Sequence, residues 1–437
     1  MNADAVYRRI TRRLVPFLFV CYAAAYLDRV NVGFAKLQLQ DDLQFSDTVY
    51  GLGAGIFFVG YILFEVPSNV VLHRIGAKWW IARIMVTWAL ISGAMAFINS
   101  ATMFYILRFL LGVAEAGFIP GILLYLTYWF PAQRRGRVTA IFLAAIPVAT
   151  IVGGPLSGWI LTAFDEVGGL GGWQWMFLIE AVPSLVLGLL VLRYLDNSVD
   201  AARWLSNAEK DVVRADLAAE EASREGGHGS IRAAMTSGRV WLLCGIYFTI
   251  ALGIYLVSFW LPTIIKGSGV ADPLTIGLLT AVPYVVAVIA MITWSAHGDR
   301  TGERRWHTTV PCLITGLGLV LTAVFLQSTA LAVGAMVLVA AGVSTAQAAF
   351  WSIPSALLTG AGAAAGIALV NSIGNIGGAV ATSLVGWLSD LTGSPASSLY
   401  TFGVVLVVGG VLVLALPRSV DDRPMVVDEG ADLGSGR

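Results

Sequence analysis

Long hydrophobic runs follow one another along almost the whole chain, and short polar stretches separate them. A helix of about 20 apolar residues spans the roughly 30 Å hydrocarbon core of a bilayer, and each run reaches about that length. The pattern therefore predicts twelve membrane-spanning helices. The first six are expected at residues 14–38, 49–72, 79–98, 102–128, 137–163 and 173–195. The second six are expected at residues 238–262, 274–297, 307–327, 330–356, 363–389 and 397–417.

A long polar stretch divides these spans into two sets of six. Within it, Ser206 is followed three residues later by Glu209, which is a capping-box pattern and predicts a surface helix. The expected organisation is a six-helix bundle, a cytoplasmic linker with a surface helix, a second six-helix bundle and a cytoplasmic tail. In that order they cover residues 1–195, 196–236, 237–420 and 421–437.

The composition is typical of an integral membrane protein. The chain is 57% hydrophobic and only 12% charged, whereas a soluble domain is about 25% charged. The net charge is zero, and nothing in the sequence indicates a nucleic-acid partner. The three cysteines lie within apolar runs, which argues against a disulfide framework or a zinc site. The fold class predicted is an all-α membrane protein.

Basic residues alternate between the connections and so predict the orientation. Lys and Arg gather before the first span and after spans two, four, six and eight, and the alternate connections have few of them. Because positive loops stay in the cytoplasm, both termini are expected there. The connection between spans ten and eleven has no Lys or Arg and is neutral evidence. The basic start of the chain runs into an apolar segment without a cleavage site, which favours an uncleaved first helix.

A weak internal repeat relates the two halves. The stretch "HRIGAKWW" (73–80) follows span two, and "DRTGERRW" (299–306) follows span eight. Both occupy the same place in their own half. Two six-helix halves with matching loops are typical of an internally repeated transporter.

Few ionisable residues lie inside the spans. Asp28 and Arg29 are in span one, and Arg108 and Glu115 are in span four. Because a charge at the bilayer centre costs about 2.5–3.5 kcal/mol, such residues are functional candidates by default. Arg108 and Glu115 share a helix face but lie about 10 Å apart, so each needs another partner. Asp28 and Arg29 point about 100° apart, so one is expected to face a substrate and the other a neighbouring helix.

These four residues favour an anionic substrate. Guanidinium groups bind carboxylates in a bidentate way, so Arg29 and Arg108 are candidate ligands. Asp28 and Glu115 are candidate proton carriers. The alternative is that the four charges form structural pairs between spans one and four. Two further acids, Glu65 in span two and Glu180 in span six, are interpreted as structural.

Other polar and aromatic residues are candidates for the wall of the same pocket. They are Tyr26, Tyr61, Trp351, Asn371 and Asn375. The two asparagines lie one helical turn apart on one face of span eleven, although asparagines in membrane helices also serve to hydrogen-bond neighbouring helices. No phosphate-binding Gly-Lys loop occurs, which argues against an ATP-driven pump. His297 and His307 lack ligand spacing, so no metal site is expected.

At this point the motifs resemble a known family. "DRTGERRW" is similar to the loop motif of the major facilitator superfamily, although His73 replaces the usual aspartate in the first-half copy. "YLDRVNVGFA", "RFLLGVAEAGFIPG" and "IEAVPS" resemble the anion:cation symporter family within it, and its bacterial tartrate, phthalate and 4-hydroxyphenylacetate transporters in particular. The resemblance implies two pseudo-symmetric six-helix bundles in a bacterial inner membrane. It also implies a functional monomer that takes up a small organic anion with protons by alternating access.

The resemblance also assigns residues. In sugar-acid members, motifs matching Asp28, Arg29, Arg108 and Glu115 carry coupling and substrate binding. The aromatic and amide residues of the pocket match Tyr26, Tyr61, Trp351, and Asn371 or Asn375. One departure concerns span five, where those members tend to carry a glutamine. Here "FLAAIPVAT" is apolar, which disfavours a polyhydroxy substrate and leaves room for a dicarboxylate or an aromatic acid.

The two loop motifs are candidate gate elements. Arg74, Asp299 and Arg300 are expected to form charge pairs that hold the cytoplasmic side shut, and the alternative is positive-inside anchoring alone. A proton-coupled exporter or an anion exchanger is the competing function, because "GGPLSGW" loosely resembles a motif of antiporters. An enzyme would need a catalytic cluster, and none is found. No cofactor is expected beyond protons as the coupling ion.

Overall fold

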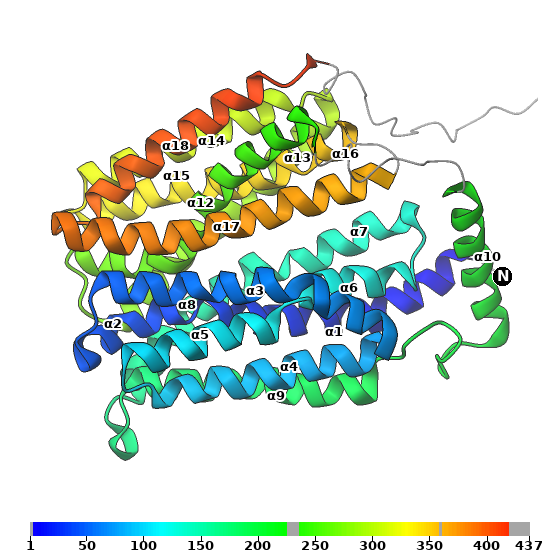
Figure 1. Cartoon of the computed structure of the whole chain (residues 1–437), viewed down its shortest axis with the longest axis horizontal. Helices are drawn as coiled ribbons and strands as arrows, with labels where there is room; N and C mark the ends of the chain where they lie inside the picture. The colour runs from blue at the N-terminus through cyan, green and yellow to red at the C-terminus, as the bar shows by residue number, and fades with distance from the viewer. Residues whose placement is uncertain (1–2, 225–235, 358–360, 419–437) are drawn as a thin grey trace, which may run out of the picture.

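Helices make up nearly all of the computed structural model (Figure 1), which describes residues 3–224, 236–357 and 361–418. No strand occurs within these ranges. The predicted tail 421–437 lies outside the described residues, as does part of the connection between spans ten and eleven. Within these described ranges, twelve helical segments are long and apolar enough to cross a membrane, which confirms the twelve predicted spans.

The first half of the chain forms spans one to six. Its elements are α1 (Ala3–Val30), α2 (Val32–Leu43), α3 (Asp47–Ile75), α4 (Ala77–Ala94), η1 (Met95–Phe97), α5 (Ala101–Glu115), α6 (Phe118–Thr127), α7 (Ala132–Leu143), α8 (Ala145–Ala163), η2 (Val167–Gly169) and α9 (Gly172–Tyr194). The surface helix α10 (Asn207–Arg224) follows. It begins with the predicted capping box, because Ser206 and Glu209 each accept a hydrogen bond from the backbone N–H of the other.

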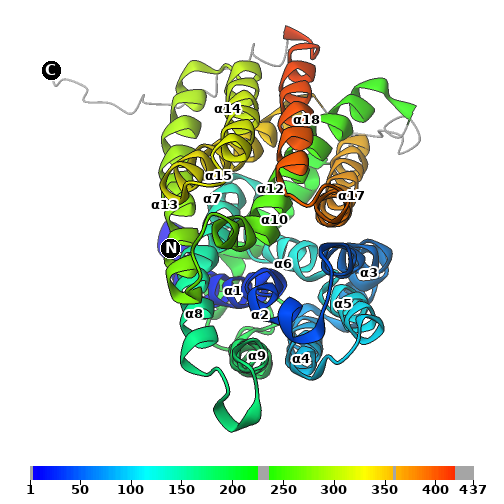
Figure 2. The ribbon, with the colours of Figure 1, turned by 90° about the vertical axis from the view of Figure 1, so that its left-hand side faces the viewer.

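The second half forms spans seven to twelve. Its elements are α12 (Gly238–Gly267), α13 (Pro273–Thr301), α14 (Arg305–Val324), α15 (Thr329–Phe350), α16 (Ser352–Leu357), α17 (Ala361–Thr392) and α18 (Ala396–Leu414). Seen along the helices in Figure 2, α3, α4, α5, α8 and α9 gather on one side and α13, α14, α15, α17 and α18 on the other. The two halves are therefore two adjacent helical bundles.

In the described residues, four spans are each divided into two helices. The first divides at Asn31, the fourth at 116–117, the fifth at Ala144 and the tenth at Trp351. The break in the fourth span requires a glycine, because Gly117 has a φ of +86° and a Cβ there would collide with the Ser68 side chain. Broken membrane helices are tolerated where neighbours satisfy the backbone, and they often mark binding sites.

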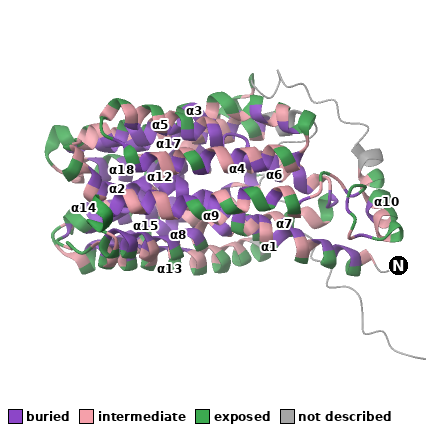
Figure 3. Cartoon of the chain, turned by 90° about the horizontal axis from the view of Figure 1, so that it is seen from below, coloured by how far each residue is buried: buried purple, intermediate pink, exposed green. Residues whose placement is uncertain are grey.

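The two bundles meet along two helix pairs. The helix α3 packs along α17, and α8 packs along α13. The second pair is close because glycines face each other: a Cβ on Gly154 would lie 2.9 Å from the carbonyl oxygen of Gly277. Small residues of this kind let membrane helices approach closely. Figure 3 shows that buried residues concentrate between the helices and exposed residues on the outside. The exposed residues include apolar ones such as Val66 and Val404.

The contacts between bundles concentrate toward one end of the molecule. In Figure 1 the chain starts at the end where α10 lies, and α18 finishes at that same end. The connections 44–46 and 268–272, which precede α3 and α13, lie at the opposite end. Interactions that join the bundles there include Lys266 with the Leu37 carbonyl, and Asp390 with the first residues of α3. We call this region the closed end and the other the termini end.

Candidate functional site

A buried ion pair joins spans one and four. Arg29 of α1 donates from Nε to the Glu115 carboxylate of α5 at 2.9 Å and also donates from Nη2 to the same oxygen. Both residues are almost fully buried. The guanidinium carbon also lies 5.5 Å from the centroid of Phe57 and 5.4 Å from that of Tyr61. The pair predicted as one alternative for these spans is therefore present, and Tyr61 lies where the pocket was expected.

Arg108 is buried without a carboxylate partner. Its Nε and Nη2 donate to the carbonyl oxygens of Gly53 at 3.3 Å and Ala54 at 3.5 Å. Its Nη1 has no hydrogen-bond partner, and no described residue forms an ion pair with it. The guanidinium carbon lies 5.0 Å from the Phe57 centroid and 5.9 Å from that of Phe259. A buried cation without an ion pair and with an unused donor is suited to an incoming anion.

Asp28 points away from Arg29, as the sequence predicts for adjacent helical residues. Its carboxylate accepts from Trp88 Nε1 at 3.1 Å and Ser92 Oγ at 3.0 Å, both on α4. The Ser184 hydroxyl on α9 donates to it as well. Asp28 is therefore held inside the first bundle. Its neighbour in the sequence, Arg29, faces α3 and α5 instead.

Two of the predicted pocket residues, Tyr26 and Asn375, form hydrogen bonds with side chains of α12. The Tyr26 hydroxyl hydrogen-bonds Ser258 of α12 at 3.1 Å across the two halves. Asn375 of α17 accepts from the Tyr255 hydroxyl at 3.2 Å, and the Tyr255 ring packs edge-on against Phe58 with centroids 4.5 Å apart. Sequence reasoning missed Tyr255, whose only signal is a tyrosine inside an apolar run.

Trp351 belongs to a different cluster. It lies at the break between α15 and α16, and its ring packs edge-on against Tyr247 with centroids 4.8 Å apart. Asn371 is half-buried and lies one turn from Asn375 on α17. The structure ties Asn375, rather than Asn371, to the aromatic residues beside the two arginines. The binding roles of all these residues stay predictions.

The predicted gate residues lie at the termini end. Arg74 is in the last turn of α3, and Arg300 is in the last turn of α13. Both side chains are exposed, and the side chain of Asp299 lies outside the described part of the chain. The two helices belong to different bundles, and the contacts that join these bundles concentrate at the closed end. The gating role of Arg74, Asp299 and Arg300 stays a prediction.

The closed end carries an ion pair that sequence reasoning missed. Lys36 of α2 is 2% exposed and lies 2.8 Å from the Asp47 carboxylate. Its ammonium is also 3.8 Å from the Trp260 ring centroid in the other bundle, a cation–π contact. Asp390 of α17 accepts from the backbone N–H groups of Asp47 at 3.1 Å and Thr48 at 2.7 Å. The signal available in the sequence is a lysine inside predicted span one.

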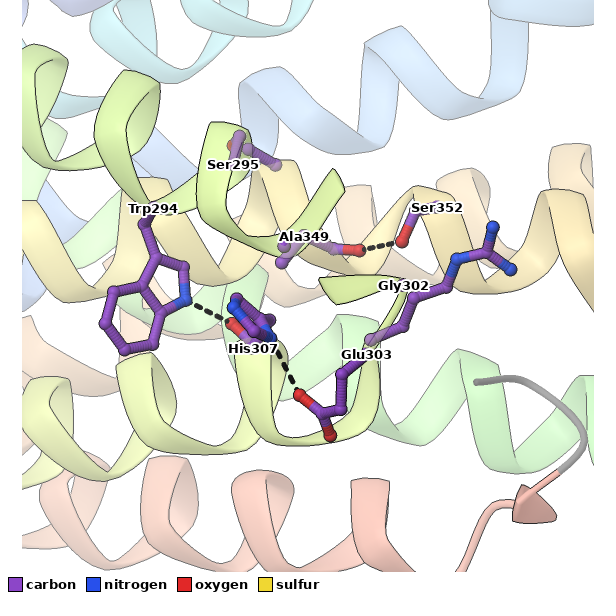
Figure 4. Close-up of a pocket in the computed structure, with 10 residues that line it drawn as sticks. Trp294, Ser295, Gly302, Glu303, His307, Ala349 and Ser352 are labelled. Atoms are coloured by element: carbon purple, nitrogen blue, oxygen red, sulfur yellow. Dashed lines mark hydrogen bonds and ion pairs between the residues drawn. The ribbon is translucent and has the colours of Figure 1, made fainter. Parts of the chain in front are cut away.

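Two histidines meet at the termini end, between α13 and α14. His297 Nδ1 lies 2.8 Å from His307 Nε2, and His307 Nδ1 lies 2.7 Å from the Glu303 carboxylate. Figure 4 shows Trp294 donating to the His307 carbonyl beside them, around a cavity of about 90 Å³. No shared role for these residues is predicted from the sequence. Their contact is made by the turn between the two helices, which spacing alone does not indicate.

Comparison with known proteins places this arrangement in a family. The family model described as Major Facilitator Superfamily matches residues 18–382 and 271–431. A putative metabolite transport protein, NicT of Pseudomonas putida, is 50% identical over 422 residues, which cover 97% of each chain. The chain belongs to the major facilitator superfamily. Members of it are transporters, and this one is accordingly a multi-pass membrane transporter and not an enzyme.

Further matches agree with this membership. A putative tartrate transporter of Agrobacterium vitis is 49% identical over 426 residues, which cover 97% of this chain and 98% of that one. Among solved structures, a bacterial homologue of the human lysosomal transporter Spinster, inward-facing and occupied, superimposes with a TM-score of 0.73 at 15% identity. That match covers 92% of this chain and 96% of the other. The major facilitator fold expected from the motifs is confirmed.

Proposed function

We propose that this transporter takes up a small organic anion, a carboxylate such as tartrate, together with protons across a bacterial inner membrane. The observation that carries the proposal is Arg108, a fully buried guanidinium with one unused donor and no ion-pair partner among the described residues. Burying an unpaired charge is costly. A bound carboxylate would offset that cost and use the free donor.

The two arginines are suited to one small dianion. Both guanidinium groups lie against the ring of Phe57, at 5.5 Å for Arg29 and 5.0 Å for Arg108. Each presents a planar fork that matches a carboxylate. The rings of Phe57, Tyr61 and Phe259 also lie near the guanidinium groups, so the arginines are the cations that would set the orientation of an anion. Small dicarboxylates of the tartrate type therefore suit this site.

The Arg29–Glu115 pair supports coupling to protons. In the structure the Glu115 carboxylate is paired with Arg29, so the carboxylate of an incoming substrate competes with Glu115 for this guanidinium group. A proton on Glu115 removes its charge and releases Arg29 for the substrate. Proton and anion then favour each other's binding, which is the thermodynamic requirement for symport. Each proton moving inward down a 100 mV potential contributes about 2.3 kcal/mol toward accumulation.

The bundle arrangement supports alternating access. The bundles contact each other mainly at the closed end, and the substrate residues lie between that end and the termini end. If the termini are cytoplasmic, as the basic loops predict, this conformation corresponds to the inward-facing state. Opening the closed end then requires the Lys36 and Asp390 contacts to break.

A binding screen followed by transport in liposomes tests the proposal. Purified protein is heated with tartrate, phthalate, 4-hydroxyphenylacetate, galactonate, glucarate and neutral sugars, since a ligand of the folded state raises its apparent stability. We expect a shift with one carboxylate that disappears in Arg108→Ala and persists in Arg83→Ala. Arg83 is a matched control because it stacks on Trp80 of the same helix, away from the site.

The same ligand is then supplied to proteoliposomes with an imposed pH gradient. Symport predicts that adding substrate outside makes the outer medium more alkaline. Shifts with neutral or cationic compounds alone would overturn the anion proposal. Acidification of the outer medium would instead identify a proton-coupled exporter, and substrate exchange without any pH change would identify an anion exchanger.

A further inference from the structure

A second buried carboxyl group, that of Glu180, lies close to Asp28 inside the first bundle. Glu180 and Ser184 are one turn apart on α9 and therefore share a helix face. Ser184 donates to Asp28, and Ser157 of α8 donates to Glu180 at 2.6 Å. Asp28 and Glu180 are each 2% exposed. The first bundle thus contains two buried acids bridged by one turn of α9.

The groups around these two acids are neutral donors. On α4 they are Trp88 and Ser92, on α8 Ser157, and on α9 Ser184. No described Lys, Arg or His forms an ion pair with either acid. Charged groups on neighbouring elements pair with each other: Arg29 of α1 with Glu115 of α5, and Lys36 of α2 with Asp47 of α3.

Two adjacent buried carboxylates without a cation are strongly unfavourable when both are ionised. Glu180 also has a buried oxygen, Oε2, that makes no hydrogen bond, and the buried amide of Asn31 beside it makes none. A proton on Glu180 gives Oε2 a donor for the Asn31 oxygen. The geometry therefore favours storage of a proton on this pair.

We propose that Asp28 and Glu180 act together as one proton-binding unit, in which Glu180 is a positioning residue that sets the pH at which Asp28 takes up the coupling proton. The inference rests on the proposed proton coupling and deepens it. Asp28 adjoins Arg29 on α1, so a movement of α1 when Arg29 changes partner also alters the bonds of Asp28 to α4 and α9. Proton and anion are thereby linked through one helix.

The test measures the pH profile of substrate uptake in proteoliposomes for Glu180→Gln. Without the second acid, Asp28 loses a like-charged neighbour, so we expect the midpoint of the profile to move to lower pH by about one unit. Exchange of labelled for unlabelled substrate at equal pH, which needs no net proton movement, is expected to persist. Glu166→Gln, which removes an exposed carboxyl in the connection before α9, is the control and should keep the wild-type profile.

Ser157→Ala provides an independent variant in case Glu180→Gln does not fold. It keeps both acids but removes a hydrogen bond that favours the ionised form of Glu180. A neutral Glu180 no longer repels the ionised Asp28, so the midpoint should move to lower pH, in the same direction as in Glu180→Gln but by less. A purely structural role of Glu180 does not move the midpoint in a variant that keeps both acids.

The outcomes separate the two proposals. If the wild type exchanges substrate but shows no uptake driven by a pH gradient, the proposed proton coupling is wrong. If the wild type is proton-driven and both variants keep its midpoint, the role of Glu180 is wrong and Asp28 or Glu115 binds the proton alone.

Discussion

The two bundles repeat one architecture but differ in chemistry. The fully buried charged residues of the described chain lie in the first bundle, namely Asp28, Arg29, Lys36, Arg108, Glu115 and Glu180. In the second bundle the buried polar residues are serines and threonines together with His307. Repetition of the fold thus does not repeat the function. In the proposed mechanism the first bundle binds the anion and the protons, and the second supplies aromatic, hydroxyl and amide groups.

The largest expected effect comes from removing a first-bundle cation. Arg29→Ala should abolish both uptake and exchange, because losing one partner of a buried charged contact costs about 2–5 kcal/mol, at least about 30-fold in affinity. It also leaves Glu115 buried and unpaired. The double variant Arg29→Gln/Glu115→Gln removes both charges and should fold and insert normally, as size-exclusion chromatography in detergent would show, and still not transport.

Normal uptake by Arg29→Ala would break the comparison, since the first bundle would then not hold the anion. Normal uptake by the double variant would show that the pair serves folding alone, which was the alternative interpretation from the sequence.

The next effect separates energy coupling from binding. Asp28→Asn keeps the size of the side chain and its contacts with Trp88 and Ser184, but it cannot carry a proton. Exchange at equal pH should stay within a few-fold of wild type, while accumulation driven by a pH gradient is lost. Proteoliposomes loaded with labelled substrate measure both. Loss of exchange as well as accumulation would place Asp28 in binding rather than in coupling.

A smaller effect is expected where the unlike bundles meet. Asp390 places a carboxylate on the first N–H groups of α3, an interaction of about 1 kcal/mol at a helix N-terminus. Asp390→Asn should therefore shift the equilibrium about fivefold toward opening at the closed end. A cysteine introduced at Ser383, which contacts Gly51 across the bundles, would react faster with a thiol reagent. An unchanged rate would mean that Lys36 and Trp260 hold this end without Asp390.

Sequence reasoning found most of the framework and the central charges, for physical reasons. Length and hydrophobicity set a span, so all twelve were predicted. Helix geometry alone required Asp28 and Arg29 to face different neighbours. The breaks at Asn31 and Gly117 were missed because apolar residues flank both of them. The choice of partner for Arg29 depends on how helices pack.

Lys36 and the histidine pair were missed for a different reason. Lys36 lies near the end of a predicted span, where a lysine normally extends to the water, and only packing shows it buried against Trp260. His297 and His307 are ten residues apart and meet because α13 turns back into α14. Long-range contacts of this kind are not encoded in the spacing of residues along one helix.

The smallest expected effect lies in the second bundle and sharpens the comparison most. Tyr255→Phe removes the hydroxyl that donates to Asn375 and keeps the ring packed on Phe58. One neutral hydrogen bond is worth about 0.5–1.5 kcal/mol, so the KM for the preferred anion should rise a few-fold while its ratio to a competing dicarboxylate changes. The pH midpoint should not move, because no titrating group of the first bundle is altered. A changed midpoint would show that the second bundle takes part in proton coupling, and the division of labour between the bundles would have to be abandoned.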